Sequence, residues 1–274
     1  MSATALFNGG PVPDLSAHRG LNYGDGVFRT CLIYESEVID IEEQCNTVNE
    51  DATRLGLEPA PTAQLVREAA GLAAGHARGV LKMTLMRAGA ARGYRGAGAA
   101  SDRLLRRYPA PDLTAAGWSR GVRACRSPVR LGSQPALAGI KHLNRLEQVL
   151  ASRDWPADVD EALLADDAGR PVCGTRTNLF WIRGGALVTP ALERSGVAGF
   201  MRRKVLALAS ALGIAAQVRD GNWDELDGAD EAFLTNSLVG IWPLARLEAT
   251  RWDAPGPVTC RLMERLAHPR WASD

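Results

Sequence analysis

The chain has 274 residues, of which 46% are hydrophobic and 23% are charged, as in a folded globular protein and unlike a disordered or fibrous one. Its 32 Lys and Arg residues against 31 Asp and Glu residues leave a net charge of +1, so no overall field favours nucleic acid or an anionic membrane. The sequence contains no run of about 18 apolar residues, and its first residues do not resemble a signal peptide. We therefore expect a cytoplasmic protein with neither nucleic acid nor membrane as a partner.

Cysteine and histidine usage argues against disulfides and against a metal site. The cysteines are odd in number and lack C-x-x-C spacing, which is typical of reduced thiols. The histidines are scattered and form no H-E-x-x-H array, so we expect no metal. The cysteines are Cys31, Cys45, Cys125, Cys173 and Cys260.

The first part of the chain mixes strands and helices. Two β-branched and apolar runs, 27–34 and 38–41, are separated by Glu35-Ser36-Glu37 and predict a β-hairpin. A helix follows and ends near Leu55, before Gly56. A second helix is predicted to start at Pro61-Thr62 and to bury one face. The residues of that face are Leu65, Ala69, Leu72 and Ala73, and further strands are expected at 80–87 and up to Tyr108.

The segment 108–119 is aperiodic and contains Pro, Ala and Asp, which is typical of a connection between domains. We therefore predict a small N-terminal domain over residues 1–112 and a larger C-terminal domain over 113–274. The second domain is predicted to continue the α/β pattern without the regular alternation of a Rossmann sheet. Its expected elements are strands at 122–127, 161–165, 179–182, 187–189 and 231–235, and helices around 143–151, 199–212 and 258–267.

Lysine is rare in this sequence, occurring at Lys82, Lys141 and Lys204. Lys141 follows a Gly-containing segment and precedes an amphipathic one, which places it at a predicted helix start. Positive charge is disfavoured there by the helix dipole, so this position would lower the pKa of the amine and suit it to Schiff-base chemistry. Lys82 falls in a predicted strand and Lys204 on a helix face, so Lys141 is the preferred reactive lysine.

Several motifs together resemble the class IV aminotransferase family, over nearly the whole chain. The resemblance implies an α/β (α+β type) protein of fold type IV, with pyridoxal 5'-phosphate as cofactor, an active site between the two domains and a homodimeric assembly. The string at 140–147 resembles the lyase branch of that family. The motifs are RGLNYGDGVFRT at 19–30, RGY at 92–94, IKHLNRLE at 140–147, GTRTNLFW at 174–181, GVAGFMR at 196–202 and NSLVG at 236–240.

The resemblance also implies roles for individual residues. Lys141 matches the lysine that binds the cofactor covalently and moves the substrate proton. Val197 and Ala198 match backbone amides that receive the cofactor phosphate at a helix start, and Ser237 with Leu238 matches a second phosphate loop.

Two positions depart from the family pattern at opposite ends of the cofactor. Thr47 stands where the family has an arginine that binds the phosphate, and Cys173 stands where it has a glutamate that pairs with the pyridine nitrogen. Loss of an arginine–phosphate contact weakens binding by about tenfold or more. An unpaired pyridine ring stabilises a carbanion poorly.

Three activities are therefore compared. The resemblance implies a lyase that converts 4-amino-4-deoxychorismate to 4-aminobenzoate and pyruvate, as in folate biosynthesis. A second hypothesis, based on Thr47 and Cys173, is a homologue that no longer binds pyridoxal phosphate and acts on a chorismate-like or secondary-metabolite ligand, as an enzyme or as a binding protein. A D-amino-acid or branched-chain aminotransferase ranks third. Candidate substrate-binding residues are Thr30, Arg92, Tyr94 and Arg145.

Overall fold

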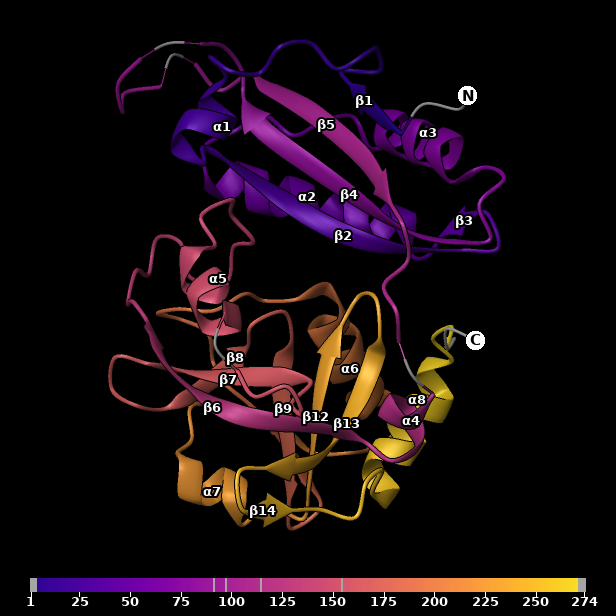
Figure 1. Cartoon of the computed structure of the whole chain (residues 1–274), viewed down its shortest axis with the longest axis vertical. Helices are drawn as coiled ribbons and strands as arrows, with labels where there is room; N and C mark the ends of the chain where they lie inside the picture. The colour runs from indigo at the N-terminus through magenta and orange to yellow at the C-terminus, as the bar shows by residue number, and fades with distance from the viewer. Residues whose placement is uncertain (1–3, 91, 97, 114, 154, 271–274) are drawn as a thin grey trace. The chain divides into compact units, whose positions relative to one another are not determined.

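The protein divides into two compact units of mixed α/β structure, as predicted for the fold class (Figure 1). Unit 1 comprises Met1–Pro111 together with Ile140–Asn144, and unit 2 comprises Asp112–Gly139 and Arg145–Asp274. The sequence suggested a single cut after residue 112, whereas the short segment 140–144 groups with unit 1. The computed structural model describes residues 4–90, 92–96, 98–113, 115–153 and 155–270.

Unit 1 is built on an antiparallel sheet with the strand order β1-β5-β4-β2-β3. Strands β2 and β4 pair along nearly their whole length, from Gly26 opposite Met86 to Tyr34 opposite Arg78. This pairing makes β2 and β4 the centre of the unit. The strands are β1 (Ala5–Phe7), β2 (Gly26–Tyr34), β3 (Glu37–Val38), β4 (Arg78–Arg87) and β5 (Ser101–Tyr108).

Helices α2 (Ile41–Arg54) and α3 (Thr62–Ala73) pack on one face of this sheet and enclose the core of unit 1. The predicted buried face of α3 is confirmed, because Leu65, Ala69, Leu72 and Ala73 are all buried. The short helix α1 (Arg19–Tyr23) precedes β2. The opposite face of the sheet carries the alternate side chains of β2 and β4.

The predicted hairpin is confirmed in its turn but not in its second strand. Glu35 and Ser36 both have positive φ, at 50° and 67°, as the two central residues of a primed hairpin turn require. Strand β3 ends at Val38, whereas the sequence predicted a strand to Ile41. That extension is wrong because Ile41 begins α2, directly after Asp40 in the left-handed region.

Unit 2 contains a larger mixed sheet with the strand order β11-β10-β9-β12-β13-β6-β7-β8. The sheet contains parallel pairs (β13 with β6, β6 with β7, β10 with β11) as well as antiparallel ones. The strands are β6 (Val122–Leu131), β7 (Glu161–Asp166), β8 (Pro171–Gly174), β9 (Asn178–Arg183), β10 (Ala186–Thr189), β11 (Ala216–Val218), β12 (Glu231–Asn236), β13 (Gly240–Leu247) and β14 (Thr250–Arg251).

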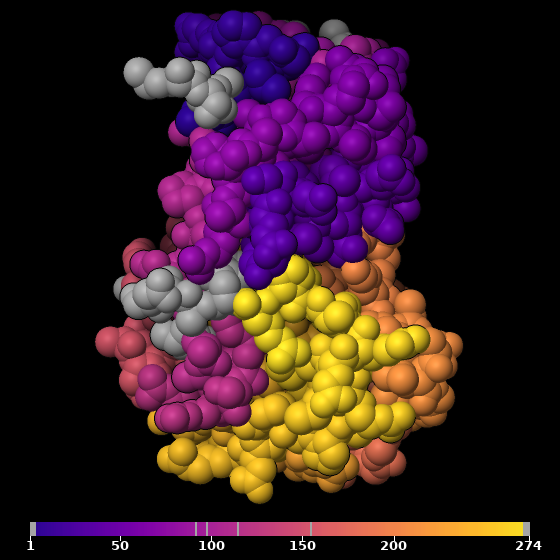
Figure 2. All heavy atoms as spheres, turned by 90° about the vertical axis from the view of Figure 1, so that its right-hand side faces the viewer, coloured from indigo at the N-terminus to yellow at the C-terminus, as the bar shows by residue number. Residues whose placement is uncertain are grey.

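The core of unit 2 lies between this sheet and the helices α6 and α8. Phe180 on β9 stacks on Phe233 on β12, with ring centroids 4.9 Å apart, and both rings are fully buried. Figure 2 shows the last part of the described chain, which includes α8, as yellow atoms on the surface of unit 2. The helices are α4 (Ala116–Ser119), α5 (Leu146–Arg153), α6 (Phe200–Ala211), α7 (Trp223–Asp227) and α8 (Pro257–Leu266).

Helix α5 differs from the amphipathic helix predicted around 143–151. It begins at Leu146, because Leu143 donates its backbone N–H to the Gly26 carbonyl at 3.0 Å and is held in an extended segment. Its large apolar side chains face solvent within the single chain: Leu146 is 75% exposed and Val149 60%. Ala151 is the buried residue of this helix.

Within the described ranges, none of the helices combines the length and apolar character needed to cross a bilayer.

Candidate active site

Lys141 lies on an extended segment beside β2, and not at a helix start. Its carbonyl accepts the Phe28 N–H at 2.9 Å, and His142 forms an antiparallel bridge with Val27. Helix α5 begins only at Leu146. The predicted helix-dipole effect on the Lys141 amine is therefore wrong: the segment extends the edge of β2 that the short β3 leaves open.

The Lys141 ammonium lies over an aromatic ring of the sheet face opposite α2 and α3. Its Nζ is 4.8 Å from the centroid of Phe28. The Nζ of Lys82, on β4, is 4.6 Å from the same centroid. Burial lowers the pKa of Lys82 below its ordinary value. Two cations of unit 1 thus converge on one ring.

Sequence reasoning missed Lys82 as a site residue because its strand position was used to set it aside. Its environment gives the signal: it is the one charged side chain in the otherwise apolar or hydroxyl run from Val80 to Met86. The register of β2 and β4 places Lys82 directly opposite Thr30, so both lie on the sheet face of Phe28. The structure therefore places the predicted residue Thr30 on one sheet face with Phe28, Lys82 and Lys141. We call these four residues the Phe28 group.

Two further predicted substrate residues, Arg92 and Tyr94, lie on the loop that follows β4. Both are exposed, Tyr94 to 92%. Arg19 holds this loop by donating from Nη1 to the Gly93 carbonyl at 2.8 Å, and the Tyr23 ring meets the Tyr94 ring edge-on. Their substrate roles stay predictions.

Arg145 belongs to unit 2, immediately before α5, and is half-buried. Its role in substrate binding also stays a prediction.

The turn before α6 is the candidate anion site of unit 2. The Asn178 side chain donates to the Val197 carbonyl at 2.7 Å, and a Cβ on Gly199 would clash with the Asn178 Oδ1 atom. Gly199 is the N-cap residue, and no side chain caps the helix. The first-turn amides of α6 therefore have no intrahelical acceptor, and such amides can bind an anion.

Of the two amides assigned to the phosphate, that of Ala198 has a different partner. It donates to the Gly139 carbonyl at 2.9 Å, while the Gly139 N–H donates to the Gly196 carbonyl at 3.0 Å. This pair of bonds fastens the turn to the strand-like segment that leads to Lys141, two residues later. The Ala198 amide is therefore already used by the Gly139 carbonyl, and a phosphate role for the amides of this turn stays a prediction.

The loop between β12 and β13 contains the predicted residues Ser237 and Leu238. The Asn236 Oδ1 atom accepts the N–H groups of Leu238 at 2.8 Å and of Val239 at 3.0 Å. The Leu238 amide is thus used to shape the loop, and sequence reasoning missed Asn236 as the residue that does so. The role of Ser237 stays a prediction.

The two departures from the family pattern are both uncharged and buried in the structure. Thr47, on α2, is 1% exposed and donates from Oγ1 to the Glu43 carbonyl at 2.7 Å. Cys173, on β8, is 6% exposed and belongs to an apolar cluster with Leu131, Leu164 and Leu192. Neither position supplies the charge that the family residue would.

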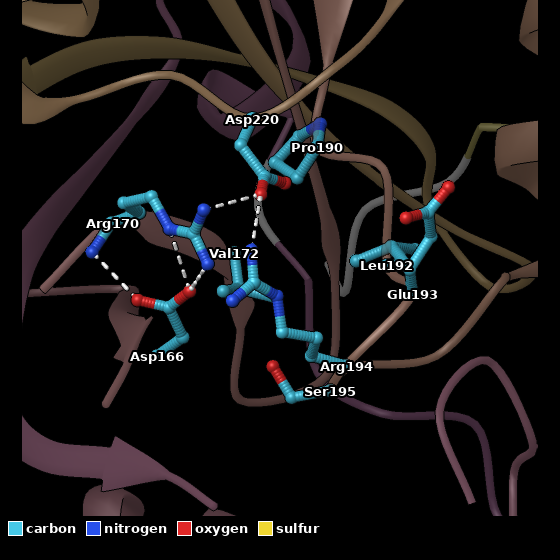
Figure 3. Close-up of a pocket in the computed structure, with 9 residues that line it drawn as sticks. All are labelled: Asp166, Arg170, Val172, Pro190, Leu192, Glu193, Arg194, Ser195 and Asp220. Carbon is cyan, nitrogen blue, oxygen red and sulfur yellow. Dashed lines mark hydrogen bonds and ion pairs between the residues drawn. The ribbon is translucent and has the colours of Figure 1, made fainter. Parts of the chain in front are cut away.

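A shallow pocket beside the 190–196 segment is formed by paired charges (Figure 3). Arg170 bonds Asp166 through Nε at 2.8 Å and contacts Asp220 at 2.8 Å, and Arg194 approaches Asp220 at 4.0 Å. Burial opposes the charge of Asp166, but the hydrogen bonds from Arg170 outweigh it and hold the pKa of that carboxyl below its ordinary value. These charged groups pair with one another, so we interpret them as holding the conformation of the segment that leads to α6.

The chain belongs to the class IV aminotransferases, because a sequence profile of that family, Amino-transferase class IV, matches residues 26–247. It is 34% identical to an aminodeoxychorismate lyase from Vibrio harveyi, over 90% of this chain and 93% of that protein. The crystal structure of 4-amino-4-deoxychorismate lyase from Pseudomonas aeruginosa superposes with a TM-score of 0.89 at 39% identity, covering 96% of this chain and 97% of that one.

A branched-chain aminotransferase from Thermoproteus uzoniensis superposes with a TM-score of 0.83 at 22% identity, covering 96% of this chain and 93% of that one, and this likeness shows the fold. Class IV aminotransferases use pyridoxal phosphate, and the residues present fit most of that group. Lys141 offers the amine, and the uncapped start of α6 offers phosphate-binding amides. At the pyridine end, Cys173 offers a thiol in apolar surroundings in place of a carboxylate.

Proposed function

We propose that this chain is a pyridoxal-phosphate-dependent lyase that converts 4-amino-4-deoxychorismate to 4-aminobenzoate and pyruvate. The observation that carries the proposal is the pair of lysines at the Phe28 ring, because one amine can react while the other binds a substrate carboxylate. Relatives named for this activity match the chain over nearly its full length. The product would enter folate biosynthesis in the cytoplasm, as the family resemblance implies.

The two lysines of the Phe28 group have separate tasks in this reaction. The Lys82 ammonium binds one substrate carboxylate, and Thr30 lies opposite it on the same sheet face. The Lys141 Nζ atom, as a neutral amine, takes the proton from the ring carbon that bears nitrogen, and the bond between the ring and the enolpyruvyl oxygen breaks. The proton then passes from Nζ to the methylene carbon of the departing enolpyruvate, which gives pyruvate. Pyridoxal phosphate, when bound, supplies electron withdrawal next to the substrate nitrogen. Formation of the aromatic ring supplies much of the driving force.

The choice between lyase and aminotransferase is tested by direct assay. With pyridoxal phosphate supplied, 4-amino-4-deoxychorismate should give equal amounts of 4-aminobenzoate and pyruvate. D-alanine or a branched-chain amino acid with 2-oxoglutarate should give negligible transfer, because transamination depends more strongly on the pyridine partner that Cys173 replaces. Robust transfer without lyase activity would refute the proposal.

The reactive lysine is tested by borohydride reduction of the cofactor-loaded protein followed by peptide mapping. The adduct should lie on Lys141 and disappear in Lys141→Ala. Lys204→Ala is the matched control, since Lys204 also lies over an aromatic ring, with its Nζ 5.6 Å from the Phe200 centroid, and should leave the adduct intact. An adduct on Lys82 or Lys204 would overturn the assignment.

A cofactor-free role is the second candidate function, and the buried, uncharged Thr47 and Cys173 favour it. Titration of the purified protein with pyridoxal phosphate distinguishes the two. The lyase proposal expects an absorbance band of a lysine-bound cofactor. Folded protein that gives no such band would support the cofactor-free role.

We also propose that the chain forms a homodimer. The exposed apolar side chains of α5, Leu146, Val149 and Leu150, support this assembly because contiguous exposed apolar surface is typical of an interface.

A further inference from the structure

A buried ion pair lies on the helix-covered side of the unit 1 sheet. The Arg29 Nη2 atom, from β2, is 2.5 Å from the Asp51 Oδ2 atom, from α2. Arg29 is 3% exposed and Asp51 5%. Removing two charges from water is costly, and such a pair is sustained when further hydrogen bonds satisfy its remaining atoms.

The same carboxylate oxygen makes such a bond to the candidate reactive lysine. Asp51 Oδ2 accepts the backbone N–H of Lys141 at 3.2 Å. On its other side, the Lys141 carbonyl accepts the Phe28 N–H at 2.9 Å. The backbone of this one residue is therefore bonded to the helix through its N–H and to the strand through its carbonyl.

We propose that the Arg29–Asp51 ion pair positions Lys141 for its reaction: Asp51 fixes the lysine backbone, and Arg29 fixes the Asp51 carboxylate. This inference rests on the proposed role of Lys141. Arg29 and Asp51 are positioning residues, since Asp51 bonds the Lys141 backbone and Arg29 acts through Asp51. A displaced backbone would move the Nζ atom away from the Phe28 ring, and a misplacement of about 1 Å is enough to slow a reaction strongly.

Two double variants separate positioning from charge. Arg29→Met/Asp51→Asn removes both charges but keeps a side-chain oxygen that can accept the Lys141 N–H. Arg29→Met/Asp51→Leu removes the charges and the acceptor together. Replacing both partners avoids leaving one buried charge uncompensated, so both variants should fold. If the second does not fold, Arg29→Thr/Asp51→Ala takes its place.

The matched control is a partly buried ion pair of unit 1. Arg103 Nη2 is 2.7 Å from Glu68 Oε1, and their side chains are 13% and 10% exposed. Arg103→Met/Glu68→Leu therefore removes a comparable pair that makes no described bond to residues 140–144.

Backbone amide exchange and cofactor affinity are then measured on each variant. Arg29→Met/Asp51→Leu should speed exchange at Lys141 and weaken pyridoxal phosphate binding, each by about tenfold, and should shift the pH midpoint of the bound-cofactor absorbance. Arg29→Met/Asp51→Asn keeps the acceptor for the Lys141 N–H but loses Arg29, which fixes its position, so it should change both quantities by clearly less than Arg29→Met/Asp51→Leu does. The control should stay close to the unchanged protein.

If the Asp51→Asn and Asp51→Leu double variants show equal amide exchange at Lys141 and equal cofactor affinity, positioning by Asp51 is overturned. The same holds if the control variant changes these two quantities as much as Arg29→Met/Asp51→Leu does. Unchanged amide exchange in Arg29→Met/Asp51→Leu would also overturn it. If the unchanged protein takes up no pyridoxal phosphate, the proposed function fails. Amide exchange at Lys141 then decides the positioning role alone, because it needs no cofactor.

Discussion

Lys82 and Lys141 place their ammonium groups over one aromatic ring, with Nζ atoms 4.6 Å and 4.8 Å from the centroid of Phe28. The two lysines come from different parts of the chain, one from the middle of β4 and one from the segment that returns to unit 1 after residue 139. Two cations at one aromatic ring suit an anionic ligand, with one amine able to react while the other binds.

The first prediction concerns substrate binding by Lys82. Lys82→Met should raise the KM for 4-amino-4-deoxychorismate by about tenfold or more, because one charge-assisted contact is lost. Lys82→Arg should retain most of the affinity. The borohydride adduct at Lys141 should form in both variants. An unchanged KM in Lys82→Met would show that the carboxylate binds elsewhere.

The second prediction follows from the lowered pKa of Lys82, which burial causes. Between its folded-state pKa and the ordinary value of 10.5, the unfolded chain binds more protons at this residue than the folded chain does. The free energy of unfolding should therefore rise with pH in that window relative to Lys82→Met. Urea unfolding of both proteins at several pH values below 10.5 measures the difference. Parallel curves would contradict a lowered pKa of the half-buried Lys82.

Local patterns predicted most of the elements, and tertiary pairing explains the main errors. The face of α3 follows from helical spacing, and Leu65 and Ala69 are buried as expected. The helix predicted to carry Leu143 starts three residues later because a backbone bond to Gly26 keeps that residue extended. Such a contact joins residues far apart in the sequence, and spacing alone does not reveal it.

In the candidate site too, local sequence patterns predicted some residues, and tertiary pairing determines the others. The sequence singled out Lys141 by its rarity and motif, but not Lys82, whose importance depends on the register between β2 and β4. It singled out Val197 and Leu238, but not Asn178 and Asn236, which hold the corresponding loops through side-chain bonds. These residues act through geometry that appears only once the strands are paired.

The third prediction tests the homodimer. Leu146→Glu/Val149→Glu should convert a dimer to monomers, because it places charge on the exposed apolar side of α5. Val218→Glu is the matched control: Val218 is 52% exposed on β11 and should leave the assembly unchanged. Sedimentation velocity measures both. A dimer that survives the α5 substitutions would place the interface on another surface.

The fourth prediction concerns acid stability. The Asp166 carboxyl has a lowered pKa because hydrogen bonds from Arg170 outweigh the opposing effect of burial. Its stabilising contribution is present above the unfolded-state pKa and is lost as the pH falls through the folded-state value. Arg170→Met should therefore lower stability at neutral pH and flatten the acid-unfolding curve. Arg123→Met, which removes a 3.5 Å pair with Asp158 between side chains about half exposed, should change little.

The last prediction restores both family charges. Thr47→Arg and Cys173→Glu together should tighten pyridoxal phosphate binding by about tenfold or more, through an arginine–phosphate contact and a carboxylate partner for the pyridine nitrogen. The family resemblance implies that the two positions contact opposite ends of the cofactor, so their effects on binding free energy should add.

Without cofactor, the restored charges should also lower the stability of the fold. Cys173→Glu places a carboxylate in the cluster of Leu131, Leu164 and Leu192, and an unpaired charge there is unfavourable, so thermal unfolding should occur at a lower temperature and recover when cofactor is added. Thr53→Arg is the control for position 47, because exposed Thr53 lies on the same helix and likewise bonds the carbonyl four residues earlier, that of Asn49. If the double variant binds no more tightly than Thr53→Arg, these two residues do not limit cofactor binding, and the cofactor-free role gains support.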